Sequence, residues 1–244
     1  MKQTVIYCPT KNKALSYATV FLQESRIPVL STPDESVTHL LLPIPSFYSD
    51  GTIRGGGDLE TILSVLPKDI TVIGGNLQHP ALEGHPLLDL LQDPIYAAEN
   101  AGITAHCAVK LLAACLPCTL KDLPVLLIGW GRIGKLTAHL LRANGAAVTV
   151  CARKEADRGL LTAFGYPVQA VPDPAGFRAV INTAPAQVLP NCPDDILKIE
   201  LSSVLGIGGN GVLWARGLPG TQAPESSGKL IGQSILRLLK EVTL

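Results

Sequence analysis

Residues 125–128 form an aliphatic run that leads directly into a glycine-rich turn, residues 129–134. This stretch restricts the fold more than any other part of the chain. Apolar residues then recur at helical spacing over residues 133–143. A strand, a turn of the form G-x-G-x-x-G and a helix, in this order, are typical of a dinucleotide-binding unit. The pattern therefore predicts a parallel sheet with a ligand at the end of this strand.

Each glycine of the turn has its own physical task in such a unit. Gly129 permits the tight turn, Gly131 lets the backbone approach a pyrophosphate, and Gly134 lets the helix pack closely on the strand. The N-terminus of the helix then offers N–H groups to the phosphates. A structural turn without a ligand is the alternative. The residues predicted to bind the dinucleotide here are Gly129, Trp130, Gly131, Arg132, Ile133 and Gly134.

The end of the next predicted strand, residues 147–151, bears on which dinucleotide binds. A site for NAD usually has Asp or Glu about 20 residues after the first glycine. Here the corresponding stretch contains Arg153 and Lys154, and its first acid is Glu155. Arginine suits a 2′-phosphate because it can bind it in a bidentate manner. We therefore predict NADP, with NAD as second choice; two solvated basic residues on a loop are the alternative.

The composition describes a chain with a large core and no preference for a charged partner. Apolar residues make up 47% of the 244 residues, and 20 basic residues balance 20 acidic ones. A neutral balance gives no reason to expect nucleic acid or a membrane surface as partner. No apolar run approaches the roughly 18 residues of a membrane-spanning helix. We expect a globular protein with buried parallel strands, which read as continuous apolar runs.

The N-terminus and the cysteines favour a reducing, cytoplasmic compartment. The chain begins without a signal-peptide pattern, and its six cysteines accompany no secretory feature. Cys115 and Cys118 form a C-x-x-C pair, but further ligands at zinc spacing are missing. The pair also follows a predicted helix, whereas reactive thiols lie at helix N-termini. We expect no metal site and predict that both are small buried residues at a helix end.

Strand-like and helix-like segments alternate along the chain, which predicts an α/β fold with parallel sheets. We place a first domain at residues 1–102 and a second domain, with a linking helix, at residues 103–225. Residues 226–244 are predicted to return to the first domain, with a helix over residues 226–242.

Several shorter segments have specific predictions. Residues 85–91 are predicted as a short helix, residues 95–96 as a strand, and residues 103–116 as an apolar, buried helix. A glycine-rich loop, residues 43–57, follows a predicted strand. Its length and its place at the carboxyl end of a strand favour ligand binding. A mobile surface loop is the alternative.

Residues 180–185 read as a strand that ends in a polar, proline-stiffened turn. In a dinucleotide-binding fold this strand end lies beside the nicotinamide ring. Asn182 and Thr183 are therefore predicted to contact the ring or its ribose, and Ala184 and Pro185 complete the turn. An ordinary strand-end turn is the alternative.

Four motifs resemble those of the dipicolinate synthase A-chain family. They are the glycine-rich turn, the pair Ala152-Arg153, the turn at residues 181–185, and Gly217-Leu218-Pro219-Gly220 followed by Ala223-Pro224. The last motif is the most specific of the four. The resemblance covers most of the chain and is strongest from about residue 95 onward.

The resemblance implies both a fold and an activity. The fold would be two doubly wound parallel-sheet domains, a flavodoxin-like N-terminal domain and a Rossmann domain, joined by long helices. The activity would be oxidation of dihydrodipicolinate, or its hydrated precursor, to dipicolinate with NADP⁺, in sporulating bacteria. The partners would be a small dicarboxylate and a second, flavoprotein-like subunit. A homo-oligomer is left open.

The implied substrate carries two carboxylates, so its site needs basic side chains or N–H donors. His106 is the expected proton acceptor, because an unperturbed histidine titrates near pH 6.5; an ordinary hydrogen-bonded helix residue is the alternative. Thr104 is expected beside it at the reacting centre. The residues expected to bind the substrate are Pro43, Ser46, Arg216, Gly217, Leu218 and Pro219.

Two stretches depart from the family pattern. Cys8-Pro9 stands where the family usually has Gly-Gly-Asp, and His106-Cys107 stands where it tends to have Glu-Gly. These departures keep two other hypotheses open. One is a different NADP-dependent dehydrogenase of a small carboxylate, and the other is a nucleotide-binding subunit without catalysis.

Overall fold

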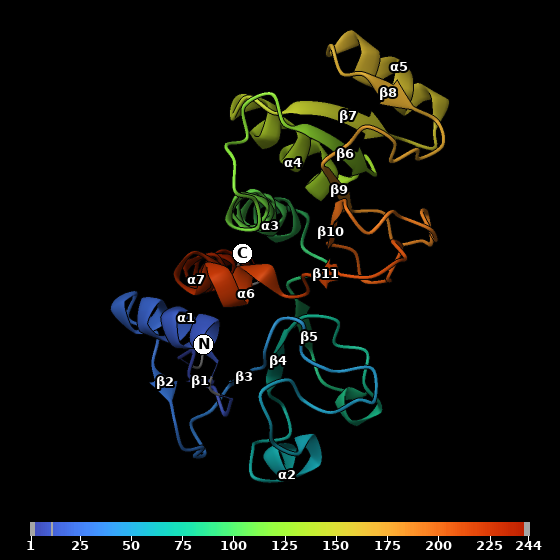
Figure 1. Ribbon diagram of the computed structural model, residues 1–244. Coiled ribbons are helices and arrows are strands. Elements are labelled where there is room, and N and C mark those ends of the chain that lie inside the picture. Colours follow the sequence, from blue (N-terminus) through green and yellow to red (C-terminus); the bar gives the residue numbers. More distant parts are fainter. Residues whose placement is uncertain (1–2, 11, 242–244) are drawn as a thin grey trace. The chain divides into compact units, whose positions relative to one another are not determined.

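The computed structural model describes residues 3–10 and 12–241 and divides into two compact units (Figure 1). Unit 1 comprises Met1–Asn100 and Pro219–Leu244, and unit 2 comprises Ala101–Leu218. The units therefore meet in sequence after residues 100 and 218, whereas the predicted domains meet after residues 102 and 225.

Unit 1 contains a five-stranded sheet in the order β2-β1-β3-β4-β5, and all its strand pairs are parallel. This is the order of flavodoxin-like folds, so the predicted fold class of the N-terminal part is confirmed. Its strands are β1 (Ile6–Tyr7), β2 (Val29–Leu30), β3 (His39–Leu41), β4 (Thr71–Gly74) and β5 (Leu87–Asp89).

Unit 2 contains a six-stranded sheet in the order β11-β10-β9-β6-β7-β8, also parallel throughout. Numbered within the unit, this is the Rossmann order, which reverses between the first and fourth strands. Its strands are β6 (Pro124–Ile128), β7 (Ala147–Cys151), β8 (Val168–Gln169), β9 (Ala179–Asn182), β10 (Leu197–Glu200) and β11 (Val212–Trp214).

Polar side chains cap the first turns of α1 and α2. Asn12 accepts a hydrogen bond from the N–H of Leu15 at 2.8 Å, and Asp58 accepts one from Thr61 at the same distance. Val242, the predicted last residue of the C-terminal helix, lies outside the described residues. The helices are α1 (Lys13–Glu24), α2 (Leu59–Ser64), a 3-10 turn η1 (Pro80–Leu82), α3 (Pro94–Ala114), α4 (Arg132–Ala143), α5 (Glu155–Ala163), α6 (Leu218–Gln222) and α7 (Pro224–Glu241).

Two predicted elements are wrong around the start of α3. Residues 85–91 contain strand β5 rather than a helix, and residues 95–96 lie inside α3 rather than in a strand. Asp93 explains the second error, because its carboxylate accepts the N–H of Tyr96 at 2.8 Å. Asp at the cap position followed by Pro94 is a strong helix start, and it outweighs the strand preference of the next residues.

The prediction for the cysteine pair is also wrong. Cys115 and Cys118 are exposed, free thiols. The reason is that α3 ends at Ala114, so the chain has left the helix and the core before it reaches either cysteine. Within the part of the chain that the structure describes, no helix combines the length and apolar character needed to cross a membrane.

The faces of the unit 2 sheet are covered in different ways. Val125 and Leu127 of β6 pack in a cluster with residues of α3, α4 and α5. Leu126 and Ile128 point to the opposite face and pack with Leu189 and other residues of the segments between the last strands. Helices therefore cover one face, and irregular segments cover the other.

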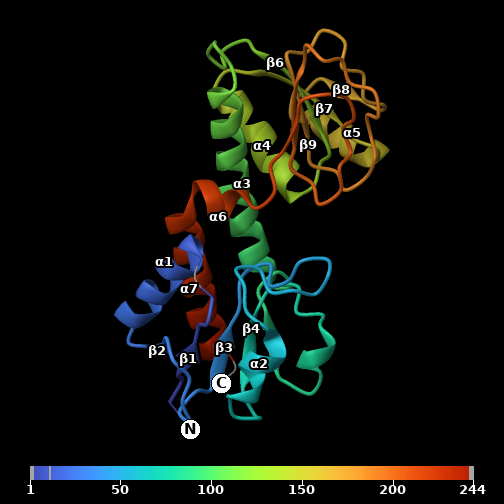
Figure 2. The ribbon, with the colours of Figure 1, turned by 60° about the horizontal axis from the view of Figure 1, so that its bottom comes forward.

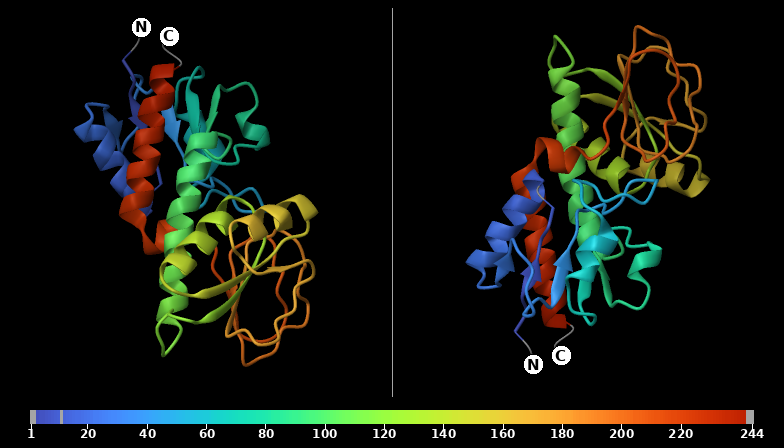
Figure 3. Two further views of the ribbon diagram at one scale, coloured as in Figure 1. Left: turned by 90° about the horizontal axis from the view of Figure 1, so that it is seen from above. Right: turned by 90° about the horizontal axis from the view of Figure 1, so that it is seen from below.

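Helix α7 packs against α1 within unit 1 (Figures 2 and 3). Gly228 and Gly232 of α7 make the close approach possible, since a methyl group at Gly228 would lie 2.4 Å from the carbonyl oxygen of Ala14. Arg237 of α7 also forms an ion pair with Asp93, the cap of α3. The C-terminal helix is thus held to unit 1 by backbone proximity and by a partly buried charge pair.

Replacing Gly228 by alanine should destabilise unit 1. The added methyl would meet backbone atoms of Ala14 and Ala18, which cannot rotate away, so we expect a loss of about 1–3 kcal/mol. The midpoint of thermal unfolding, followed by circular dichroism, should fall by several degrees. Gly159→Ala in α5 is the matched control, because its methyl would meet nothing within 4 Å; it should be neutral or stabilising. Equal midpoints for both variants would contradict the packing described.

Candidate dinucleotide site

The glycine-rich turn lies where the strand order of unit 2 reverses, between β6 and β9. Open α/β sheets bind ligands in the crevice at this point, outside the carboxyl ends of the strands. Gly129 follows β6, and Thr183 follows β9. Thr183 ties the two strand ends together, since its N–H and its hydroxyl both donate to the carbonyl of Ile128, at 2.8 and 2.9 Å.

Steric contacts around the three glycines match the tasks expected of them. Gly129 has φ +102°, and a methyl group there would lie 2.5 Å from the hydroxyl oxygen of Thr183. A methyl group at Gly134 would lie 2.3 Å from the carbonyl oxygen of Gly129. A methyl group at Gly131, in contrast, would meet nothing within 4 Å. Two glycines are thus required by the protein itself, and the third faces open space.

The N-terminus of α4 suits an anion. Gly131 is its N-cap residue, and no side chain caps the helix, so N–H groups of its first turn lack a side-chain acceptor. Arg132 and Lys135, both exposed, add positive charge close by. Helix N-termini of this kind bind phosphate groups through N–H donors and the helix dipole. The space beside Gly131 therefore fits a pyrophosphate.

The side chain of Trp130 packs within unit 2. The indole packs edge-on against Tyr166 at a centroid distance of 5.9 Å and against the core of unit 2. Its ring N–H is buried and has no hydrogen-bond partner among the described residues. The indole therefore anchors the turn to the sheet.

The loop after β7 presents the two basic residues on which the NADP prediction depends. Arg153 and Lys154 are exposed, and Lys154 is the N-cap residue of α5. Arg158 fixes this loop, because its guanidinium donates to the carbonyls of Ala152 and Arg153 at 3.0 and 2.7 Å. The sequence reasoning missed Arg158, since it did not identify α5; the acid-rich start of that helix was the available signal.

The turn after β9 differs in one respect from the prediction. The side chain of Asn182 is fully buried and donates to the carboxylate of Glu200 at 3.0 Å, so it does not face the site. Thr183 and Ala184 are half-buried, and Pro185 is exposed. The surface of this turn therefore comes from Thr183, Ala184 and Pro185, with Asn182 behind them. Glu200 was not anticipated from the sequence; it is the last residue of β10.

The loop at residues 43–57 in unit 1 is folded as a hairpin. Phe47 and Ile53 form an antiparallel bridge, and the N–H of Tyr48 donates to the carbonyl of Thr52 at 2.9 Å. Ser46 is fully buried; its hydroxyl donates to the carbonyl of Pro43 at 2.8 Å and accepts the N–H of Gly75 at 3.0 Å. This hydroxyl therefore shapes the loop, and a substrate contact by Ser46 stays a prediction.

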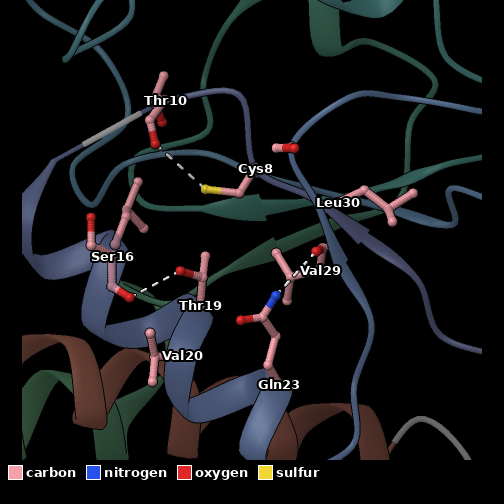
Figure 4. A pocket seen from close by; sticks show the side chains of 10 residues that line it. Cys8, Thr10, Ser16, Thr19, Val20, Gln23, Val29 and Leu30 are labelled. Carbon is pink, nitrogen blue, oxygen red and sulfur yellow. Dashed lines mark hydrogen bonds between the residues drawn. The ribbon is translucent and has the colours of Figure 1, made fainter.

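A pocket of about 300 Å³ lies beside α1, between that helix and the ends of β1 and β2 (Figure 4). Cys8 lines it and donates its thiol to the carbonyl of Thr10 at 3.6 Å. Burial raises the pKa of the Cys8 thiol to about 11, so Cys8 is a neutral thiol near pH 7 rather than an anion-binding or nucleophilic group. The chain thus presents an uncharged group to this pocket at Cys8.

The other predicted substrate residues differ in accessibility. His106 is exposed on α3, and Thr104 is buried. Arg216 is exposed and stacks on the ring of Trp214 at 4.7 Å from its centroid. Leu218 is buried, and Gly217 adopts φ +67°. Unit 1 carries Pro43, Ser46 and Pro219, and unit 2 carries Thr104, His106, Arg216, Gly217 and Leu218.

The described residues include no group of His, Cys, Asp and Glu side chains that could hold a metal ion. The donor set of the site consists of backbone N–H groups and basic side chains. This chemistry suits an anionic nucleotide rather than a cation.

No protein-family model and no curated protein sequence matches the chain, but solved structures do. The A chain of dipicolinate synthase from Bacillus halodurans matches with a TM-score of 0.80 and 19% identity, over 98% of each chain. The A chain of dipicolinate synthase from Bacillus subtilis matches with a TM-score of 0.80 and 19% identity, over 100% of this chain and 97% of that one. Phosphoglycerate oxidoreductase from Vibrio cholerae matches with a TM-score of 0.53 and 15% identity, over 99% and 100%. The resemblance noted in the sequence is thus confirmed as similarity of fold.

Alanine at Gly134 and alanine at Gly131 should have different effects on stability. Gly134→Ala forces a methyl group onto the carbonyl oxygen of Gly129, so we expect a loss of about 1–3 kcal/mol. Gly131→Ala meets open space and ordinary backbone angles, so we expect a loss below about 1 kcal/mol. Urea unfolding of the ligand-free variants gives both values. Similar losses for the two variants would show that the glycines do not have separate tasks.

Proposed function

We propose that the chain is an oxidoreductase that uses a nicotinamide dinucleotide. The observation that carries this proposal is the open space at Gly131, between two glycines that the protein itself requires. It lies at the uncapped N-terminus of α4 and at the reversal of strand order. The fold shared with an oxidoreductase and with the A chains of dipicolinate synthase supports the same conclusion.

The cofactor proposed is NADP rather than NAD. Arg153 and Lys154 stand at the end of β7, where an NAD site usually has an acid. Both side chains are exposed, and Arg158 holds the backbone between them and the strand. An anchored loop that presents two cations favours the extra phosphate of NADP.

The substrate proposed is dihydrodipicolinate, or its hydrated precursor, which is oxidised to dipicolinate. When bound, NADP⁺ would supply a hydride acceptor for a ring carbon of the substrate, and the product would be aromatic. The proton that is lost goes to His106, whose exposed position on α3 supports this role. The exposed side chain of Arg216 supplies donors for a carboxylate, and Thr104 stands two residues before His106 on the same helix.

The cellular setting proposed follows the same family. A second, flavoprotein-like subunit is the proposed partner, a homo-oligomer is a further assembly to test, and sporulation is the proposed context. The six free cysteines favour a reducing, cytoplasmic compartment.

A specific observation favours a second candidate function, a different NADP-dependent dehydrogenase of a small carboxylate. Cys8 is an inert thiol where the family usually has a polar turn, and the Ser46 hydroxyl is used inside its own loop. Both differences concern groups expected on the substrate side, and neither concerns the cofactor.

The cofactor proposal predicts a ranking of ligands by thermal shift and calorimetry. At 100 times its dissociation constant, NADP⁺ should stabilise the protein by about 2.7 kcal/mol relative to the ligand-free state. NAD⁺ at the same concentration should stabilise it less. The double variant Arg153→Ser, Lys154→Ser should bind NADP⁺ at least about tenfold more weakly and NAD⁺ unchanged. Gly131→Ala should bind neither well, because its methyl occupies the space that fits the pyrophosphate.

Arg178→Ser is the matched control for the basic residues. Arg178 is exposed and precedes β9, at the opposite edge of the sheet from the glycine-rich turn. It should leave both affinities unchanged. Stronger binding of NAD⁺ by the wild-type protein would overturn the choice of NADP, and binding of neither would overturn the function.

The substrate proposal is tested by formation of NADPH from NADP⁺ and dihydrodipicolinate, with the chain alone and with the flavoprotein-like partner added. We expect turnover, and His106→Gln should lower it by about 10²–10⁴-fold if His106 takes the proton. His139→Gln is the control, because His139 is also exposed on a helix of unit 2. Turnover of another small carboxylate with dihydrodipicolinate inert would favour the second candidate.

A further inference from the structure

Glu200 is a buried acid that the proposed chemistry does not use. It is the last residue of β10, and its exposure is 0%. Its carboxylate accepts hydrogen bonds from the side chain of Asn182 and from the N–H groups of Ser202, Gly206 and Ile207, at 2.8–3.2 Å. All these partners are donors, which matches the acceptor-only character of a carboxylate.

The partners of Glu200 belong to two different loops. Asn182 begins the turn after β9, and residues 202–207 form the loop after β10. Gly206 allows the two loops to approach, since a methyl group there would lie 2.4 Å from the side-chain nitrogen of Asn182. One buried carboxylate therefore joins two loops at the carboxyl edge of the sheet.

Asn182 also holds the backbone of the turn at residues 183–185. Its side-chain oxygen accepts the N–H of Ala184 at 2.9 Å, and its nitrogen donates to the carbonyl of Ala184 at 3.0 Å as well as to Glu200. Both ends of the amide are thus used to hold Ala184. The residue between them, Thr183, is fixed by its own two hydrogen bonds to Ile128.

Thr183 in turn contacts the glycine-rich turn. Its hydroxyl oxygen would lie 2.5 Å from a methyl group at Gly129 and 3.0 Å from one at Gly134. A continuous set of contacts therefore leads from Glu200 through Asn182 and Thr183 to the glycines. In a two-half dinucleotide fold, β9 and β10 belong to the half opposite the adenosine-binding strand β7.

We propose that Glu200 is a positioning residue for the nicotinamide half of the site, which it holds in place through Asn182 and the turn at residues 183–185. The inference rests on the proposed function. It predicts that Glu200 matters for binding of the whole dinucleotide and not for binding of its adenosine half. Glu200 touches no ligand itself, because its side chain is enclosed by the two loops.

The experiment compares two ligands in each variant by calorimetry. NADP⁺ occupies both halves of the site, whereas adenosine 2′,5′-bisphosphate occupies only the half at Arg153 and the glycine-rich turn. Glu200→Gln places a donor against N–H donors, so affinity for NADP⁺ should fall about tenfold to a hundredfold. Affinity for the bisphosphate should stay within about twofold of wild type. Glu200→Asp keeps the charge on a shorter side chain, and its loss should be smaller.

If Glu200→Gln does not fold, Asn182→Ala is used for the same comparison. This variant is milder because it leaves the three backbone donors to Glu200 in place. It should also weaken NADP⁺ and spare the bisphosphate. Asp195→Asn is the control for changing an acid to an amide in unit 2. Asp195 is exposed, and both affinities should stay unchanged.

The outcomes separate this inference from the proposed function. A loss of affinity confined to NADP⁺ supports both this inference and the proposed function. If the wild-type protein binds NADP⁺ but the Glu200→Gln variant loses affinity equally for both ligands, the role of Glu200 is overturned and the cofactor proposal stands. The same conclusion follows if folded Asn182→Ala keeps its affinity for NADP⁺. Wild-type protein that binds neither ligand overturns the proposed function and this inference together.

Discussion

The contact between the backbone of Gly129 and the residues that face it is the constraint on which the rest of unit 2 depends. Gly134 approaches its carbonyl, and Thr183 approaches its α-carbon, so strand β6, helix α4 and the end of β9 meet at one point. None of the three elements can shift without opening a gap or creating a clash. Gly131, between these two crowded glycines, faces open space instead.

In both units, a buried polar side chain joins two segments at the carboxyl edge of the sheet. In unit 1 the buried hydroxyl of Ser46 joins the loop after β3 to the end of β4 through Gly75. In unit 2 the buried carboxylate of Glu200 joins the loops after β9 and β10. A buried polar group left without its partner costs more than the bond gains, so each side chain specifies one loop geometry. The groups that shape these edges are therefore different from the groups that can touch a ligand.

Much of this fold could be predicted because parallel strands and capped helices leave local signals. The aliphatic run before Gly129 and the spacing of the next helix are sufficient to place β6 and α4. The sequence could not reveal that Asn182 and Ser46 point inward, because burial of a polar side chain depends on partners distant in the chain, Glu200 and Gly75. The errors at β5 and α3 have a local cause, since the Asp93-Pro94 helix start was given less weight than the apolar residues after it.

A dinucleotide and a dicarboxylate require different kinds of interaction with a protein. A pyrophosphate is bound by backbone N–H groups, so sterically required glycines reveal its site. A dicarboxylate is generally bound by side chains. In this chain Cys8 is a half-buried thiol whose pKa burial raises to about 11, and Ser46 is enclosed. Arg216 remains, and Trp214 stacks on the face of its guanidinium group. Such stacking restricts the rotation of a guanidinium group and leaves its N–H edge available to an acceptor.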